Sequence, residues 1–147
     1  MTDELDLRII NLLMDNSKWS YRKLAARLGV SVATVMNRVN RLNKEKIIKK
    51  YSVIIDYEKL GYELSVIVEV RVSRGKMVDI EKKIAEHPNV SAVFDTTGHF
   101  DIMILASFKS RMDMDKFLKK INTYDFIART ETKIILNTIK DEHIKVA

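Results

Sequence analysis

The chain has 147 residues, of which 46% are hydrophobic and 31% are charged, and its formal net charge is +6 at pH 7. This length suits one ordinary domain or two small ones. The lack of cysteine excludes a disulfide framework and a cysteine-ligated zinc site. The acidic start MTDELDLR lacks a signal-peptide core, and no apolar run approaches the roughly 18 residues of a membrane span. We therefore expect an intracellular, cytoplasmic protein without a membrane segment.

The first predicted element is a helix that begins near Asp3. Its first turn is acidic, which the helix dipole favours. Apolar residues then recur at helical spacing, namely Leu5, Ile9, Leu12 and Leu13. The stretch Asp15-Asn16-Ser17 ends this helix, which we expect to back the next two.

The stretch from Ser20 to Lys46 predicts two helices separated by a tight turn at Gly29-Val30. Ser20 and Ser31 can each cap a helix, because a serine hydroxyl accepts from a backbone amide of the following turn. Gly29 stands where a left-handed residue is needed to end the first of them. In the second helix the residues expected to face the core are Val32, Val35, Val39 and Leu42, with Met36 at the margin.

The opposite face of that second helix is rich in hydrogen-bond donors and carries no acid, and it holds Ala33, Thr34, Asn37, Asn40, Arg41 and Lys44. A DNA major groove would accept such a face. Arg38 lies between the two faces, so it either reaches a phosphate or packs its stem and braces the helix.

The charge around these helices is strongly basic. Between Lys18 and Tyr51 the only acidic residue is Glu45, and such a field favours a polyanion over the alternative of a merely solvated helix face. We therefore predict that the partner is double-stranded DNA. The predicted DNA-binding residues are Ser31, Ala33, Thr34, Asn37, Arg38, Arg41, Lys44, Lys49, Lys50 and Arg22.

The pattern changes after Lys46. A β-rich segment around Tyr51 to Asp56 predicts a strand-containing linker that ends near Leu60-Gly61. Lys49 and Lys50 at its entrance either touch the DNA backbone or protect the strand edge. This reading divides the chain into a helix-turn-helix domain at 1–50, a linker strand at 51–62 and a C-terminal domain at 63–147.

The C-terminal domain begins with a strand, because from Leu64 to Val72 the hydrophobic period is two. A helix bearing Met77, Ile80 and Ile84 follows and ends at His87-Pro88. Two alternating runs, 90–97 and 100–108, are joined at Gly98. A helix around 114–121 and a last strand from about 127 to 139 complete the order βαββαβ.

This order predicts an α+β fold with a ferredoxin-like sandwich, in which helices cover one face of an antiparallel sheet. The second face would carry Ile67, Val93, Met103, Leu105 and Ile135 among polar residues. Subunit association would bury these side chains, so we expect at least a homodimer.

A helix-turn-helix (winged-helix-like) domain, a linker strand and a βαββαβ domain, in this order and length, resemble the Lrp/AsnC family of prokaryotic transcription regulators. The matching stretches are LDLRIINLL, the S-x-x-x-L-A-x-x-L-G-V-S of Ser20 to Ser31, the R-V-x-R-L of Arg38 to Leu42, Tyr51, Asp56-Tyr57, Leu60-Gly61 and the T-G-x-x-D of Thr97 to Asp101. There are two departures. Lys23 stands where an acid is common, and Lys46 stands where the family usually turns on glycine.

The resemblance implies a sequence-specific DNA-binding transcription regulator that forms dimers, often assembled into octamers or larger discs. It also implies a small effector, such as an amino acid, bound between C-terminal domains. The loop Thr97-Gly98-His99-Phe100-Asp101 matches the region that the family uses for the effector. Gly98 would let a ligand approach the backbone, and Asp101 could accept hydrogen bonds from an α-ammonium group.

Another interpretation of this loop stays open, namely a plain hairpin turn in which Asp101 satisfies local amides. Thr130 and Thr132 on the last strand are weaker candidates for effector binding, since threonine is also an ordinary strand former.

Little in the sequence indicates an enzyme. His87, His99 and His143 have no metal-ligand spacing, and no phosphate loop or nucleophile motif is present. We predict no catalytic residue, no metal and no cofactor other than the effector. The alternative function is an architectural chromatin-type protein that coats DNA without a ligand. A third is a metabolite-sensing domain that serves an enzyme, for which the basic N-terminal unit would be superfluous.

Overall fold

The computed structural model describes residues 2–73 and 77–147, but not the side chains of Met77 and Val78, so the predicted place of Met77 in the helical stripe lies outside the described residues. The chain forms two compact units, Met1–Ile54 together with Lys140–Ala147, and Ile55–Ile139. The last residues therefore belong to the N-terminal unit, a return that the predicted division into consecutive domains did not include.

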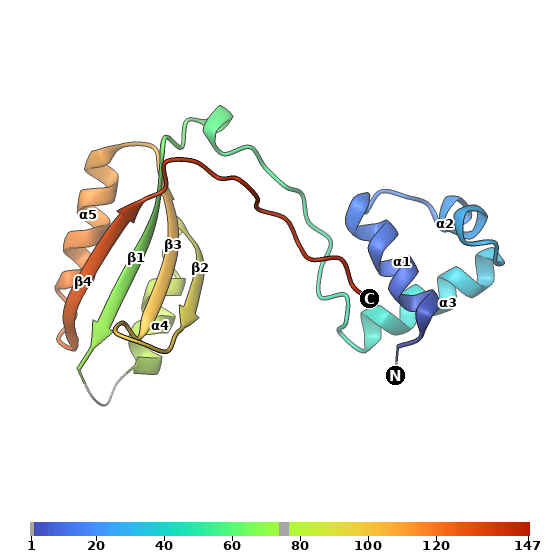
Figure 1. Ribbon diagram of the computed structural model, residues 1–147, viewed down its shortest axis with the longest axis horizontal. Coiled ribbons are helices and arrows are strands. Elements are labelled where there is room, and N and C mark those ends of the chain that lie inside the picture. Colours follow the sequence, from blue (N-terminus) through green and yellow to red (C-terminus); the bar gives the residue numbers. More distant parts are fainter. Residues whose placement is uncertain (1, 74–76) are drawn as a thin grey trace. The chain divides into compact units, whose positions relative to one another are not determined.

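The N-terminal unit is helical, with α1 (Glu4–Asp15), α2 (Tyr21–Leu28) and α3 (Val32–Lys44) (Figure 1). Helices α2 and α3 each begin at the predicted cap. The Ser20 hydroxyl accepts from the Lys23 amide at 3.2 Å, and the Ser31 hydroxyl accepts from the Thr34 amide at 3.0 Å. Gly29, at φ 71°, ends α2 in the left-handed conformation. The helix-turn-helix prediction is thus confirmed.

The core of this unit consists of Ile9, Leu13, Leu24, Ala25, Leu28, Val35, Val39 and Leu42. Val32 was expected among them, but it is 44% exposed, and Met36 at the margin is 42% exposed. A helical wheel gives the direction of a side chain but not whether a neighbouring helix reaches its level. The exposed surface of α3 is therefore wider and more apolar than predicted.

Helix α3 ends in a turn that places a lysine in an unusual conformation. Lys46 has φ 56°, and it is the only described non-glycine residue with positive φ. The Ile47 amide donates to the Leu42 carbonyl at 3.0 Å, and the Lys46 amide donates to the Asn43 carbonyl at 3.0 Å. This double closure is the Schellman turn, whose left-handed position favours glycine.

Lys46→Gly should therefore stabilise the N-terminal unit by about 1 kcal/mol, because glycine relieves the strain between Cβ and the carbonyl in the left-handed region. Urea denaturation followed by the fluorescence of Trp19, the single tryptophan of the chain, measures this change. Lys44→Gly, within the last turn of α3, is the matched control and should destabilise, since glycine there only adds backbone freedom. A loss of stability in Lys46→Gly would contradict the assignment of this turn.

The predicted linker strand is not formed. Residues 51–56 pair with no strand in the described parts of the chain, and Glu58–Leu60 form a short 3₁₀ helix that Gly61 ends at φ 83°. Val53 is 70% exposed and Ile54 is 88% exposed. A β-rich segment becomes a strand only when a neighbour supplies backbone partners, and a single copy of the chain supplies none here.

The C-terminal tail contacts α1 within the first unit. The Asn11 side-chain amide donates to the Val146 carbonyl at 2.8 Å and accepts from the Val146 amide at 2.9 Å. Lys145 forms an ion pair with Asp15. These contacts join residues more than 100 positions apart, so no local pattern could indicate them.

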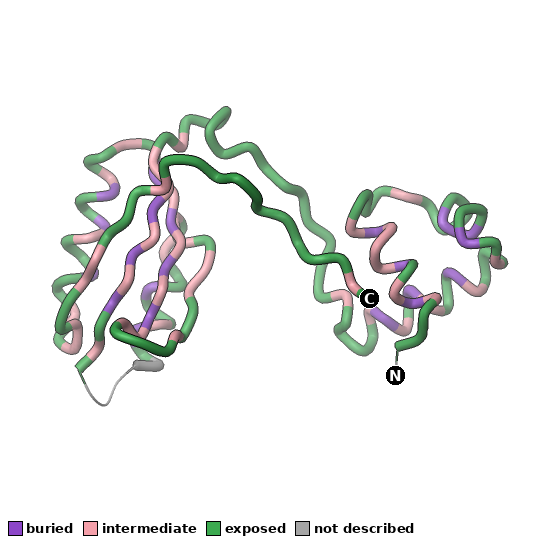
Figure 2. The backbone as a smooth tube through the Cα atoms, in the orientation of Figure 1, coloured by how far each residue is buried: buried purple, intermediate pink, exposed green. Residues whose placement is uncertain are grey.

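The second unit contains β1 (Leu64–Val72), α4 (Met77–Ala85), β2 (Val90–Asp95), β3 (Ile102–Phe108), α5 (Arg111–Asn122) and β4 (Ile127–Ile134). The antiparallel strands lie in the order β2-β3-β1-β4, and both helices cover one face of the sheet (Figure 1). The α+β, ferredoxin-like prediction is confirmed. The alternation predicted for β1 and β3 also holds, since every second residue is buried against the helices (Figure 2).

The other face of the sheet is open and partly apolar. Ile67 lies opposite Leu105, and Met103 lies opposite Phe94, which is 49% exposed. Val93 does not belong to this face as predicted. An irregularity in β2 between Val90 and Ala92 shifts the register, so Val93 pairs with the buried Ile104 and packs on the helical side.

Candidate nucleic-acid interface and effector loop

The exposed polar face of α3 is the candidate DNA-reading surface. Ala33, Asn37, Asn40 and Lys44 are all exposed along it, as predicted. At its start the Ser31 and Thr34 hydroxyls lie 2.8 Å apart, so Thr34 takes part in the cap. The face therefore combines a small residue, two amides and a lysine with room for contact.

The two arginines of α3 are directed at α1 instead. Both oxygens of Asp6 are engaged, one by Arg38 at 3.2 Å and the other by Arg41, and Arg38 also pairs with Asp3. Asp6 is fully buried, and the Nε of Arg41 is buried without a partner among the described residues. The Arg38 guanidinium, together with the Asp6 amide, lowers the pKa of the Asp3 carboxyl below its usual value.

We call Asp3 and Asp6 with Arg38 and Arg41 the acid clamp, and it changes the roles expected for the two arginines. Arg41 is not free to approach a base in the unbound chain, and of the two interpretations of Arg38 the geometry favours bracing. From the sequence, Asp6 was expected only as one of the acids at the start of the first helix. Its position three residues after the Asp3 cap signals a capping box, which is present. No local signal indicated its arginine partners.

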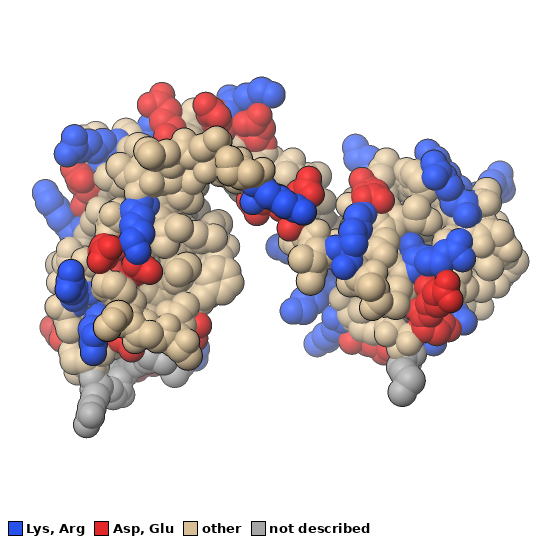
Figure 3. Space-filling model, viewed as in Figure 1, with Lys and Arg blue, Asp and Glu red and all other residues tan. Residues whose placement is uncertain are grey.

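The remaining predicted DNA contacts, Arg22, Lys49 and Lys50, are exposed. Lys23 and Arg27 of α2 lie over the Trp19 ring, at 4.5 and 5.1 Å from its centroid. These cation–π contacts hold their charged groups close to the helix. Figure 3 shows several Lys and Arg side chains on the visible surface of this unit. The structure therefore keeps cations exposed around α2 and α3.

The loop between β2 and β3 is the candidate effector loop. Gly98 has φ 117°, a backbone conformation that residues with a side chain rarely adopt. Open space surrounds the position where a Cβ would lie. One oxygen of Asp101 accepts from the Val72 amide at 2.7 Å. The carbonyl of His99 accepts from Arg71 at 3.1 Å, and Arg129 lies 6.0 Å from the Phe100 ring.

Asp101 satisfies a local amide, as the hairpin interpretation expects, and its role in effector binding stays a prediction. Thr97, Gly98 and His99 are exposed beside it. Arg71 and Arg129, which the sequence did not single out, also lie at this loop.

Thr130 and Thr132 do not point to the open sheet face. They pair with the buried Val70 and Val68, so their side chains lie on the helical side, where the Thr130 hydroxyl donates to Asn122 of α5 at 3.2 Å. Thr132 is exposed. Thr130 lies near the end of β1, where the loop also lies, but its side chain is on the helical side of the sheet. The neighbouring Arg129 side chain is on the open face of the sheet.

A capped helix-turn-helix with an open amide-rich face, followed by a separate α+β domain, defines a DNA-binding transcription regulator with a ligand-binding module. Residues 3–43 match the AsnC-type helix-turn-helix domain, and residues 65–144 match the Lrp/AsnC ligand binding domain. The chain belongs to the Lrp/AsnC family of transcription regulators.

Relatives agree with this assignment. An HTH-type transcriptional regulator of Pyrococcus furiosus is 39% identical over 140 residues, which cover 95% of each chain. The regulator FL11 of Pyrococcus horikoshii is 31% identical over 139 residues, which cover 95% of this chain and 92% of that one. The structure of Escherichia coli AsnC, 29% identical, superposes with a TM-score of 0.92 and 99% coverage of both chains. Among the described helices, none has the length and apolar character needed to cross a bilayer.

Proposed function

We propose that this regulator reads double-stranded DNA with the exposed face of α3, with Asn37 and Asn40 as the base-reading residues. The observation that carries this proposal is that these amides are exposed while Arg38 and Arg41 are held on α1. Asparagine can pair with both edge groups of adenine in the major groove. Ala33 beside them leaves room for close approach.

Two apolar neighbours extend this surface. Val32 and Met36 are about as exposed as each other and stand one turn apart on α3. An exposed apolar side chain next to an adenine-reading amide fits the methyl group of thymine. The proposed site therefore favours A·T pairs under the first half of α3, with Ser31, Arg22, Lys44, Lys49 and Lys50 at the phosphates.

The second part of the proposal is a homodimer through the open sheet face, assembled further into an octamer or another higher homo-oligomer. Ile67, Leu105, Met103 and Phe94 make this face too apolar to stay wet. A dimer presents two α3 helices, so its DNA site is pseudopalindromic, with half-sites about 34 Å or a multiple apart. Such a regulator acts in the cytoplasm, where prokaryotic DNA lies.

The third part is an amino-acid effector at the β2–β3 loop. A regulator of the same fold from Neisseria meningitidis, 19% identical with a TM-score of 0.90 over 100% of this chain and 97% of that one, has been solved as a complex with L-Met. In this chain, Asp101 would accept from the α-ammonium group, and the open space at Gly98 would admit the ligand to the backbone.

Asp101→Asn should abolish the effect of the amino acid on DNA affinity, a coupling expected to be about 5- to 150-fold. The asparagine oxygen can still accept from the Val72 amide, so the hairpin is kept while the charge is lost. Calorimetric titration of the common amino acids into wild type and variant, followed by DNA titration with any amino acid that binds, measures this. Equal binding by both proteins would remove Asp101 from the site.

The alternative function is an architectural protein that coats DNA without a ligand. Such a protein would contact DNA through the same lysines and arginines, but it would not read bases with Asn37 and Asn40. Selection of duplexes from a random pool separates the two. A defined motif with two related half-sites supports the regulator, whereas retention of all sequences alike supports the architectural role.

A further inference from the structure

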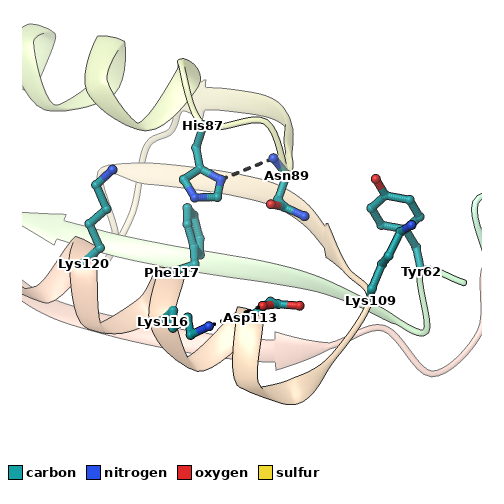
Figure 4. Close-up of a pocket in the computed structure, with 8 residues that line it drawn as sticks. All are labelled: Tyr62, His87, Asn89, Lys109, Asp113, Lys116, Phe117 and Lys120. Atoms are coloured by element: carbon teal, nitrogen blue, oxygen red, sulfur yellow. Dashed lines mark hydrogen bonds and ion pairs between the residues drawn. The ribbon is translucent and has the colours of Figure 1, made fainter.

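A hollow of about 320 Å³ lies on the helical side of the second unit, away from the β2–β3 loop. Its walls come from the start of β1, the turn after α4, the end of β3 and α5. Figure 4 shows the lining side chains, which are Tyr62, His87, Asn89, Lys109, Asp113, Lys116, Phe117 and Lys120. The volume is that of a small-metabolite pocket.

The charges in this hollow are unbalanced. Three lysines, Lys109, Lys116 and Lys120, face a single acid, Asp113. Asp113 is already engaged, because it accepts from the Ser110 hydroxyl at 2.7 Å and lies 3.9 Å from Lys116. Lys109 lies 5.2 Å from the centroid of the Tyr62 ring, and Lys120 has no carboxylate within 4.0 Å in the described part of the chain. The three ammonium groups lie on different walls of the hollow, and together they give it a net positive charge that favours an anion (Figure 4).

His87 is half-buried and forms one wall of the hollow. Its ring packs on Phe117 at 4.8 Å between centroids, and its Nδ1 accepts from the Asn89 amide at 3.3 Å, which leaves the ring proton on Nε2. Burial, and after it the ammonium group of Lys120, lower the pKa of His87. The ring is therefore neutral at pH 7 and supplies a donor on the wall that Lys120 shares (Figure 4).

We propose that this hollow is a second ligand site of the C-terminal unit, and that it binds a small phosphate-bearing metabolite. Lys120 contacts the phosphate oxygens as a point charge beside His87, and Lys109 and Lys116 attract the anion from the other walls of the hollow. The Tyr62 and Phe117 rings provide the apolar surface for the organic part. The hollow is open to solvent on one side, and its volume fits a small molecule.

The site has a direct connection to the segment that precedes the sheet. The Tyr62 amide donates to the Tyr57 carbonyl at 3.0 Å, and the two rings meet edge to face at 5.4 Å. A phosphate that draws Lys109 toward itself removes the cation from the Tyr62 ring. The ligand therefore acts on residues 57–62, at the other end of β1 from the candidate effector loop.

The test is a pyrophosphate titration of the full chain at about 0.15 M ionic strength, followed by NMR of the histidine side chains. The His87 signals should shift saturably, with half-saturation below about 1 mM, and the pKa of His87 should rise because an anion favours the charged ring. The His143 signals should stay in place. No saturable shift of His87, or a shift produced by duplex DNA but not by pyrophosphate, would overturn the proposal.

Two variants separate a site from general charge screening. Lys120→Gln should weaken pyrophosphate binding by about tenfold or more, as expected for loss of a hydrogen bond to a charged group. Lys119→Gln removes the same charge from the adjacent position, which is also exposed but does not line the hollow, and it should bind as wild type. Equal weakening by both variants overturns the proposal. Asp101→Asn should bind pyrophosphate normally, so this test succeeds or fails independently of the amino-acid effector.

Discussion

Asp6→Asn should lower the free energy of unfolding of the N-terminal unit by about 3 kcal/mol, the low end of the range for breaking a buried ion pair. Asp6 is fully buried and engages both arginines of α3, whereas the Arg38 and Arg41 side chains remain 28% and 38% exposed. The arginines can turn to water when the charge is lost, which is why the cost stays at that low end. Asparagine keeps the volume, so no cavity contributes.

Trp19 fluorescence in urea isolates this effect, because the single tryptophan lies in the N-terminal unit. Asp15→Asn is the matched control. It removes the exposed ion pair of α1 with Lys145 and should change the midpoint little. An Asp6→Asn protein that unfolds with the wild-type midpoint would show that the clamp does not hold α3 in place.

Leu105→Asp should convert the proposed homodimer to a monomer and reduce affinity for the selected DNA site by at least about 100-fold. Leu105 lies opposite Ile67 at the centre of the open sheet face, and burying an unpaired carboxylate between two such faces costs several kcal/mol. The loss of one of two coupled half-sites then lowers DNA affinity through effective concentration.

Light scattering and DNA titration of the same sample measure the two consequences together. Met112→Asp places the same charge at a residue of α5 that is 63% exposed, and should leave assembly intact. A dimeric Leu105→Asp protein would exclude the sheet face as the interface.

The helices, their caps and the sheet order could be predicted because each rests on local pattern. Serine caps, Gly29 and the two hydrophobic periods act within a few residues, and the antiparallel βαββαβ order leaves few topologies. The prediction of a strand at 51–56 was wrong because it also rested on local pattern alone. The segment has β-propensity, but a single copy of the chain offers it no strand to pair with. Val93 failed because a bulge shifts the register without a clear sequence signal.

The site was only partly predictable. The wheel placed Asn37, Asn40 and Lys44 on the exposed face, where the structure has them. It could not show that Arg41 forms an ion pair with Asp6, which lies 35 residues earlier in the chain. The cationic hollow combines residues from 62 to 120, each unremarkable in its own segment. Contacts of this kind depend on tertiary packing and are absent from local periodicity.

The central claim, that α3 reads sequence with its amides, is tested most directly by fluorescence anisotropy titration of a selected duplex and a random duplex at one salt concentration. Wild type should prefer the selected duplex by about 10³-fold or more. Asn37→Ala should lose about 1–3 kcal/mol on the selected duplex and little on the random one. Equal affinity of wild type for both duplexes, or equal weakening of both by Asn37→Ala, would contradict the account.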